Sequence, residues 1–151
     1  DDVDVSSTKV RKALKKGEVK LANEFLGYNY SLKGKVIKGK EIGRTIGFPT
    51  ANIQVADSTK LIPDNGVYAV KINVSAKEYT GMMNIGTNPT INGSHQSLEV
   101  HIFDFDASIY DEEIRIQFSD RIRSEIKFES LEALQEQLQE DKNLVQSIFL
   151  K

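Results

Sequence analysis

Residues 97–103 read SLEVHIF, and residues 113–118 read EIRIQF. In both stretches apolar residues alternate with polar or charged ones, which is the period of a β-strand with one buried face. The alternation predicts two strands and fixes which side chains enter the core. Those core residues are Leu98, Val100, Ile102, Ile114, Ile116 and Phe118.

Patterns typical of strands and turns extend over residues 32–118. Glycines recur there too often for long helices, and residues 67–74, VYAVKINV, are rich in β-formers. No long helical pattern separates the strand patterns, which disfavours a parallel βαβ sheet. About six strands at this spacing predict a mainly β fold, either a small closed barrel or a sandwich.

Helical patterns flank this region on both sides. Residues 7–26 predict two short helices, with Ser7 as a cap and a break at Gly17, and Gly27 is placed as a C-terminal cap. The apolar residues that recur there at helical spacing are Val10, Leu14, Leu21 and Phe25. Ser130 is placed to cap a helix at the C-terminal end of the chain. That helix is expected to pack on the strands through one apolar stripe, formed by Leu131, Leu134, Leu138, Val145 and Ile148.

Composition narrows the functional classes. The 151 residues contain no cysteine, which excludes disulfides, thiolate zinc sites and a cysteine nucleophile. The formal charge of −2 gives no overall attraction to nucleic acid or to an anionic membrane. No membrane-length apolar run or secretory signal is visible, so we expect a cytoplasmic protein. We also expect a monomer, because no large apolar stripe is left unassigned.

Residues 34–52, GKVIKGKEIGRTIGFPTAN, almost match a phosphate-binding P-loop. The P-loop needs Ser or Thr where this chain has Glu41, and a helix must follow. Gly43, Gly47 and Pro49 cannot continue a helix, so the P-loop interpretation fails. The lysines and glycines of this stretch suit an approaching anion. A solvated, positively charged hairpin is the open alternative.

Thr50 and Asn52 lie two residues apart at the end of this stretch. In an extended strand they point to the same face. A hydroxyl and an amide oxygen side by side are hard ligands of the kind that Mg²⁺ takes. Two hydrogen-bonded polar side chains at a strand start would have the same pattern, so composition leaves both alternatives open.

Four stretches in order resemble consecutive motifs of the riboflavin kinases, and the resemblance spans residues 31–150. They are GKVIKGKEIGRTIGFPTANI (34–53), GTNPTING (86–93), SLEVHIFDFD (97–106) and RIRSEIKFESLEAL (121–134). The resemblance implies a six-stranded antiparallel Greek-key-type barrel with a C-terminal helix packed on it. It also implies transfer of the γ-phosphoryl group of ATP to the ribityl hydroxyl of riboflavin, giving FMN and ADP.

The resemblance assigns roles to individual residues. Glu99 corresponds to the catalytic base, and Thr50 and Asn52 correspond to the ligands of the magnesium that accompanies ATP. The flavin side is assigned to Arg123, Phe128 and Asn88. The ATP phosphates are assigned to a glycine-rich flap and the motif after it, with Gly34, Lys35, Gly39, Lys40, Gly43, Arg44, Gly47, Pro49, Thr50 and Asn52.

Residues 5–36 resemble the end of the FMN adenylyltransferase domain that precedes riboflavin kinase in bacterial bifunctional FAD synthases. Ser6, Ser7, Thr8 and Arg11 carry this match. We therefore expect residues 1–30 to be a helical remnant or linker, residues 31–151 to be the kinase domain, and the longer protein to contain the adenylyltransferase domain as a partner. No adenylyltransferase activity is expected, because the two histidines, His95 and His101, form no His-x-Gly-His site.

Two other functions suit a small barrel. One is a non-catalytic barrel that binds nucleic acid, which the net negative charge disfavours. The other is a flavin-binding module, which would keep Arg123 but would need neither Thr50, Asn52 nor Glu99. The guanidinium of Arg123 could hold the flavin edge or a phosphate, and a surface ion pair with Glu125 is its alternative role. His101 is interpreted as a packing or hydrogen-bonding neighbour of Glu99.

Overall fold

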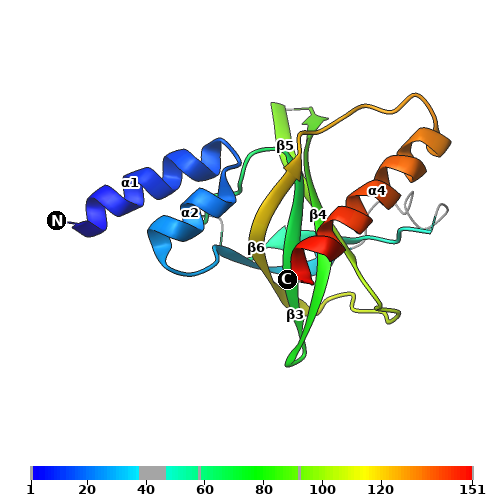
Figure 1. Cartoon of the computed structure of the whole chain (residues 1–151), viewed down its shortest axis with the longest axis horizontal. Helices are drawn as coiled ribbons and strands as arrows, with labels where there is room; N and C mark the ends of the chain where they lie inside the picture. The colour runs from blue at the N-terminus through cyan, green and yellow to red at the C-terminus, as the bar shows by residue number, and fades with distance from the viewer. Residues whose placement is uncertain (1, 38–46, 58, 92, 151) are drawn as a thin grey trace.

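The computed structural model describes residues 2–37, 47–57, 59–91 and 93–150, with the backbone alone at residues 2–6, 88–90 and 94. Two helices come first, strands follow, and a long helix ends the chain (Figure 1). In chain order these elements are α1 (Asp2–Lys15), α2 (Val19–Leu26), β1 (Ser31–Ile37), β2 (Ala51–Val55), β3 (Gly66–Val74), β4 (Lys77–Thr90), β5 (Gly93–Ile102), β6 (Glu113–Arg123) and α4 (Leu131–Phe149).

The six strands close into an antiparallel barrel in the order β1-β2-β5-β4-β3-β6. β3, β4 and β5 follow one another as hairpins, and β6 returns through residues 103–112 to lie beside β3. This is the strand order of a Greek key. The mainly β prediction and the six-stranded barrel are therefore confirmed, and the sandwich alternative is wrong.

The barrel interior is filled by every second residue of the strands. The six core residues predicted from SLEVHIF and EIRIQF are all buried, and Tyr68, Val70, Ile72, Met83 and Ile85 join them from β3 and β4. Leu32, Val36 and Ile53 complete this cluster from β1 and β2. Burial of this much apolar surface is the main stabilising term of the fold.

Gly34 lies in the middle of β1, opposite Val55 of β2 and Ile114 of β6. A Cβ at this position would collide with Ile53 Cγ2 and would lie 2.7 Å from the carbonyl oxygen of Gln54. Close approach of β1 and β2 therefore gives this glycine a packing reason, independent of any ligand. Contact of Gly34 with phosphate stays a prediction.

Helix α4 covers a second, smaller core on the outside of the barrel. Ser130 caps the helix, as predicted, because its hydroxyl accepts a hydrogen bond of 3.1 Å from the Ala133 N–H. Leu131 is 55% exposed, so the apolar stripe begins later than predicted. The core beneath the helix contains Phe48, Val67, Ala69, Met82, Phe103, Val145, Leu138 and Ile148.

The N-terminal helices pack on the opposite side of the barrel from α4 (Figure 1). Five residues of α1 and α2 are buried in the same cluster as the barrel interior: Val10, Ala13, Leu14, Val19 and Ala22. The two predicted helices are therefore present, and they share the core of the barrel. Their origin as the end of another domain stays a prediction.

Two details of these helices differ from the prediction, and one agrees. α1 already includes Ser7 well after its start at Asp2, so Ser7 is not its cap. Leu21 and Phe25 have the helical spacing of a core stripe, yet they are 37% and 39% exposed. Gly27 does adopt the left-handed conformation of a C-terminal cap, with φ of 80°.

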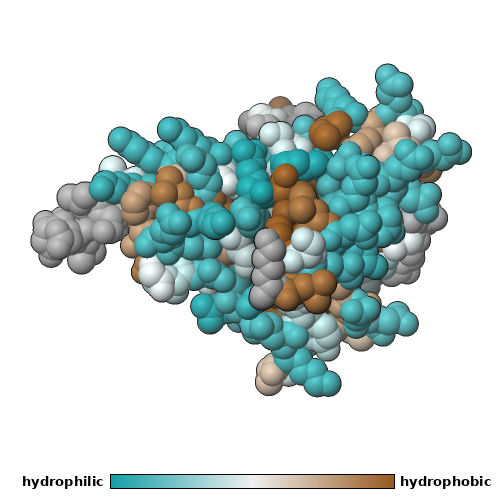
Figure 2. Space-filling view, viewed as in Figure 1, coloured by the Kyte–Doolittle hydropathy of each residue, from teal (hydrophilic) through white to brown (hydrophobic). Residues whose placement is uncertain are grey.

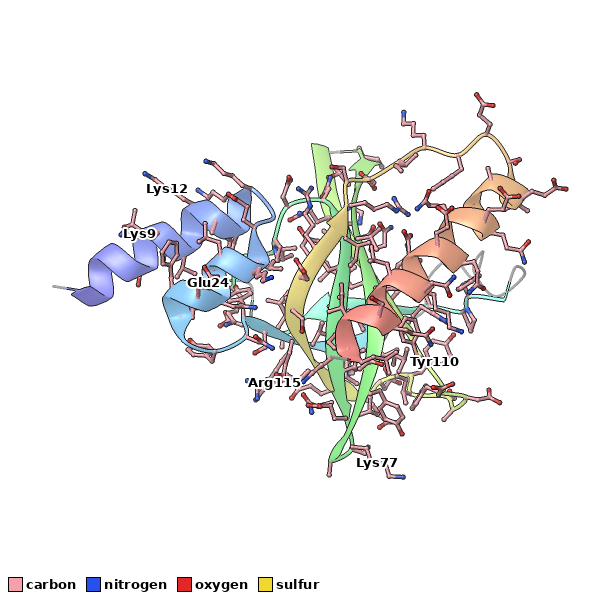
Figure 3. The ribbon with its side chains drawn as sticks, viewed as in Figure 1. Lys9, Lys12, Glu24, Lys77, Tyr110 and Arg115 are labelled. Atoms are coloured by element: carbon pink, nitrogen blue, oxygen red, sulfur yellow. The ribbon has the colours of Figure 1, made fainter. Side chains whose placement is uncertain are left out.

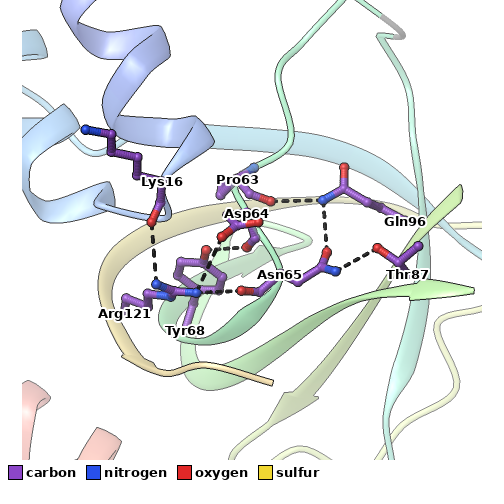
Figure 4. Close-up of polar contacts among 8 residues, drawn as sticks. All are labelled: Lys16, Pro63, Asp64, Asn65, Tyr68, Thr87, Gln96 and Arg121. Carbon is purple, nitrogen blue, oxygen red and sulfur yellow. Dashed lines mark hydrogen bonds and ion pairs between the residues drawn. The ribbon is translucent and has the colours of Figure 1, made fainter. Parts of the chain in front are cut away.

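A polar network joins the turn after α1 to the barrel (Figure 4). Arg121 of β6 donates hydrogen bonds to the carbonyl oxygens of Asn65, at 2.7 Å, and Lys16, at 3.4 Å. The same guanidinium forms an ion pair of 3.7 Å with Asp64. Tyr68 donates a hydrogen bond to the Asp64 carbonyl, and burial raises the pKa of its phenol to about 12. The network fixes the α1–α2 turn against β3 and β6.

The surface is mostly hydrophilic, with hydrophobic residues gathered between the N-terminal helices and α4 (Figure 2). Lys12 and Lys77 extend away from the protein (Figure 3), whereas Lys9 Nζ lies 5.6 Å from the centre of the Phe25 ring. Within the described part of the chain, no helix has both the length and the hydropathy to span a bilayer.

The crowding at Gly34 generates a stability prediction. Gly34→Ala should lower the free energy of unfolding by about 1–3 kcal/mol, because the added methyl must displace backbone as well as a side chain. Urea unfolding followed by circular dichroism measures the change. Lys33→Ala, at an exposed position on the same strand, should stay within about 0.5 kcal/mol of the wild type. Equal stability of Gly34→Ala and the wild type would show that β1 and β2 can separate without cost.

Candidate functional site

One row of residues crosses five strands on the outer face of the barrel. Asn52 of β2 lies opposite Glu99 of β5, which lies opposite Asn84 of β4. Asn84 in turn lies opposite Val67 of β3, and Val67 lies opposite Arg123 of β6. Neighbouring strands are about 4.8 Å apart, so hydrogen-bond pairing alone spaces these side chains at regular steps. The row is the base of the candidate site.

Arg123 joins this row because β6 is irregular. The register between β3 and β6 shifts twice, between Val67 and Tyr68 and between Ala69 and Val70. Such bulges re-aim side chains at the ends of strands. The shifts bring Arg123 opposite the outward-facing Val67.

A cavity of about 270 Å³ lies over the row, between the outer face of the barrel and α4. Segment 125–128, which connects β6 to α4, forms part of its wall. Apolar lining residues are Phe48, Val67, Met82, Met83, Ile126, Phe128, Leu134 and Leu138. Polar lining residues are Thr50, Asn84, Glu99, His101, Arg123 and Glu125. An apolar pocket with a few convergent polar groups is typical of a small-molecule site.

Thr50 and Glu99 are in direct contact in this cavity. The Thr50 hydroxyl donates a hydrogen bond of 3.2 Å to Glu99 Oε1. Glu99 is half-buried and points away from the barrel core, as the alternation of its strand predicted. The structure thus brings together the predicted catalytic base and one of the two predicted magnesium ligands.

His101 supports the backbone next to Thr50. Its Nδ1 lies 2.7 Å from the carbonyl oxygen of Pro49, so Nδ1 carries the hydrogen and Nε2 is left as an acceptor. Burial lowers the pKa of His101, and nearby Lys142 lowers it further, so the ring is neutral at pH 7. Phe48 and Phe103 pack edge-on against the ring. The interpretation of His101 as a packing and hydrogen-bonding neighbour is confirmed.

Arg123 is held by Asp141 of α4. Its Nε lies 3.0 and 3.1 Å from the two carboxylate oxygens of Asp141, and its Nη2 lies 2.9 Å from Oδ2. The guanidinium also lies 5.7 Å from the centre of the Phe128 ring. The alternative of an ion pair with Glu125 is therefore wrong, because the partner of Arg123 is Asp141.

Sequence reasoning missed Asp141 and Asn84. Asp141 is 2% exposed and follows Leu138 by three residues on the buried face of α4. A charged residue in an apolar stripe is the signal that could have found it. Asn84 follows two methionines in β4, on a strand whose alternation is weak, and no comparable signal marked it.

Of the other predicted site residues, one lies beside Glu99, several are exposed, and the rest lie outside the described residues. Asn52 is half-buried beside Glu99 on the outer face but does not line the cavity. Lys35 is exposed and lies 4.0 Å from Asp111, and Gly47 and Pro49 are exposed. Gly39, Lys40, Gly43 and Arg44 lie outside the described residues, as does the side chain of Asn88.

A second cavity of about 580 Å³ lies on the other side of Thr50. It is bounded by Pro49–Ala51, by Val36, Val100 and Ile102, and by residues 105–110 of the β5–β6 connection. Among the described residues, Thr50 alone lines both cavities. The described residues contain no cluster of three or more His, Asp or Glu side chains that could hold a metal ion by themselves.

Sequence comparison with known proteins finds matches to one protein family. The sequence model of the flavokinase family, described as riboflavin kinase, matches residues 26–149. A bifunctional riboflavin kinase/FMN adenylyltransferase from Haemophilus influenzae is 44% identical over 146 residues, which cover 96% of this chain and 47% of the relative. The protein of the same name from Listeria monocytogenes is 46% identical over 148 residues, covering 97% and 47%. The chain thus spans about half the length of these curated relatives.

Solved structures show the same fold. A crystal structure described as a macrolide-efflux protein from Streptococcus pneumoniae has a TM-score of 0.89 and 38% identity, covering 93% of this chain and 46% of that one. A riboflavin kinase from Trypanosoma brucei has a TM-score of 0.56 and 22% identity, covering 80% of each chain, and supports the fold alone. From the family match over most of its length and the identity to its relatives, this chain belongs to the riboflavin kinase family.

Proposed function

We propose that this chain transfers the γ-phosphoryl group of ATP to the terminal ribityl hydroxyl of riboflavin and releases FMN and ADP. The observation that carries the proposal is the position of Thr50. It lines two cavities and donates a hydrogen bond to a carboxylate in one of them. Two substrates bound on its two sides would meet at the Thr50–Glu99 contact, as phosphoryl transfer between them requires.

Glu99 is the proposed general base. The ribityl oxygen forms a bond to the γ-phosphorus while the bond from that phosphorus to the β–γ bridging oxygen breaks, and the electron pair leaves with ADP. The proton of the attacking hydroxyl goes to Glu99 Oε. A carboxylate that already accepts a hydrogen bond from one hydroxyl, at 3.2 Å, is suitably placed to orient a second one.

Thr50 and Asn52 are the proposed ligands of Mg²⁺. The hydroxyl and the amide oxygen are hard donors, and both residues adjoin Glu99, through a hydrogen bond and through strand pairing respectively. This donor set fits an ion that keeps several waters and shares phosphate oxygens. When bound, the ion would neutralise charge on the transferring phosphate.

The apolar cavity beneath α4 is the proposed flavin site. Its lining of Val67, Met82, Phe128 and Leu138 suits a flat ring, and Arg123 supplies polar contacts at its edge. Asn88 remains a proposed flavin contact. ATP is assigned to the second cavity, with its phosphates toward the proposed flap residues Gly34, Lys35, Gly39, Lys40, Gly43, Arg44, Gly47 and Pro49.

Other properties of the longer protein follow as proposals from its relatives. Their printed name includes FMN adenylyltransferase, so we propose that a further domain accompanies this chain in its full-length protein. A monomeric state and a cytoplasmic location stay predictions. No described feature favours the nucleic-acid-binding alternative over the kinase.

The proposed reaction has two products that can be measured directly. Protein incubated with riboflavin, ATP and Mg²⁺ should form FMN and ADP in equal amounts, separated and quantified by chromatography. Omission of ATP serves as the control. Folded protein that binds riboflavin but forms no FMN would favour the non-catalytic flavin module. Addition of excess ATP to the FMN product should give no FAD.

The role of Glu99 as general base can be tested by removing its ability to accept a proton. Glu99→Gln keeps an oxygen that can accept the Thr50 hydrogen bond but cannot take the proton, so kcat should fall by about 10²–10⁴-fold. Glu113→Gln, at an exposed glutamate of β6, is the matched control and should leave kcat unchanged. A normal kcat in Glu99→Gln would remove this residue from the role of base.

The role of Thr50 as a magnesium ligand can be tested by removing its hydroxyl. Thr50→Val keeps the side-chain shape but removes the hydroxyl, so half-maximal activity should require about 10–100 times more Mg²⁺. Titration of Mg²⁺ at fixed ATP measures the shift, and Thr80→Val, on β4 outside both cavities, controls for the loss of a threonine hydroxyl elsewhere on the barrel. An unaltered Mg²⁺ requirement would be incompatible with metal ligation by Thr50.

A further inference from the structure

Asp141 is a buried carboxylate on α4 that the proposed chemistry does not use. Its side chain is 2% exposed, while the side chain of Arg123, its partner, is 15% exposed and lines the apolar cavity. Burial of an ion pair removes both charges from water, and apolar packing of the same volume is often as stable. Stability alone therefore does not explain why the Arg123–Asp141 ion pair lies at the edge of the cavity.

The hydrogen bonds around this pair fix both partners. Asp141 accepts from Nε and Nη2 of Arg123 and, at 3.0 Å, from the side-chain amide of Gln137, one helical turn earlier. Nη1 of Arg123 donates at 3.0 Å to the carbonyl oxygen of Ser124. The guanidinium is thus clamped along one edge, and Phe128 lies against its face.

This clamp leaves limited hydrogen-bonding capacity on Arg123. A guanidinium has five N–H groups, and the bonds to Asp141 and Ser124 use three of them. One N–H on each terminal nitrogen has no partner among the residues that the structure describes. The positive charge that they carry is balanced by Asp141 at 2.9 Å. Such a group suits an uncharged hydrogen-bond acceptor better than a phosphate, which would meet the Asp141 carboxylate nearby.

We propose that Asp141 is a positioning residue for substrate recognition. It holds Arg123 in one orientation with its charge compensated, so that Arg123 binds the uncharged acceptor atoms of the flavin ring and takes no part in binding the ATP phosphates. This inference rests on the proposed function, and it decides between the two roles open to Arg123, a contact with the flavin edge or with a phosphate. Gln137 supports Asp141 from the same face of α4.

The test separates ring recognition from phosphate recognition. Dissociation constants are measured for riboflavin and for lumichrome, a ring without the ribityl chain, by fluorescence titration, and for MgADP by calorimetry. Asp141→Asn should weaken riboflavin and lumichrome alike, by about 10–100-fold, and should change MgADP by less than twofold. Glu140→Gln removes an exposed charge from the neighbouring position of α4 and should change none of the three.

A double-mutant cycle distinguishes positioning from a general structural role. In an Arg123→Gln background, Asp141→Asn should cause no further loss of lumichrome affinity, because its effect passes through Arg123. Asp141→Glu, which keeps the carboxylate, should recover part of the affinity. If Asp141→Asn does not fold, Gln137→Met provides the second variant, with a smaller loss of lumichrome affinity and unchanged MgADP affinity.

Three outcomes would overturn the inference: a parallel loss of lumichrome and MgADP affinity, an additive effect in the Arg123→Gln background, or a lower melting temperature with unchanged ring affinity. The wild type separates this inference from the proposed function. Protein that binds lumichrome through Arg123 and Asp141 but forms no FMN would contradict the kinase proposal alone. Protein that binds neither ring compound would contradict both.

Discussion

Successive side chains along each barrel strand point to opposite faces, and the two faces of this barrel do different work. Leu98, Val100 and Ile102 of β5 enter the closed interior, while Glu99 and His101 between them face α4. The interior fixes the strands by apolar burial, and hydrogen-bond pairing then sets the spacing of the outward residues. A site built this way needs no loop to bring Asn52, Glu99, Asn84 and Arg123 into one row.

Alternation made much of this arrangement predictable. The strand period placed Glu99 on the outer face, and the spacing of Thr50 and Asn52 placed both on the face that the structure shows beside Glu99. The cap at Ser130 could be predicted because it depends only on local chemistry. Closure into a barrel could not be predicted from the strand pattern alone, because that pattern also suits a sandwich. The resemblance to the riboflavin kinases was needed to choose between the two folds.

The remaining errors have a common cause in long-range packing. Leu21 and Phe25 had the right helical period, but the shared core takes Val19 and Ala22 instead. The partner of Arg123 was sought nearby at Glu125, whereas the structure supplies Asp141 from α4. Two register shifts between β3 and β6 set the direction of Arg123, and such shifts cannot be predicted from the local sequence pattern. Long-range packing also gives Gly34 a structural reason, the close approach of β1 and β2, while its assignment to the ATP phosphates stays a prediction.

Thr50 separates the two cavities, and its position has an evolutionary consequence. The cavity under α4 is lined mainly by β3, β4 and the helix, and the other by β1 and the β5–β6 connection, while β5 contributes alternate side chains to both. Under the proposed function, substitutions in β3, β4 or α4 would alter the site of the acceptor alcohol, and substitutions in β1 or residues 105–110 would alter the site of the nucleotide donor. The two specificities could then diverge at separate rates, whereas a change in β5 or at Thr50 would affect both.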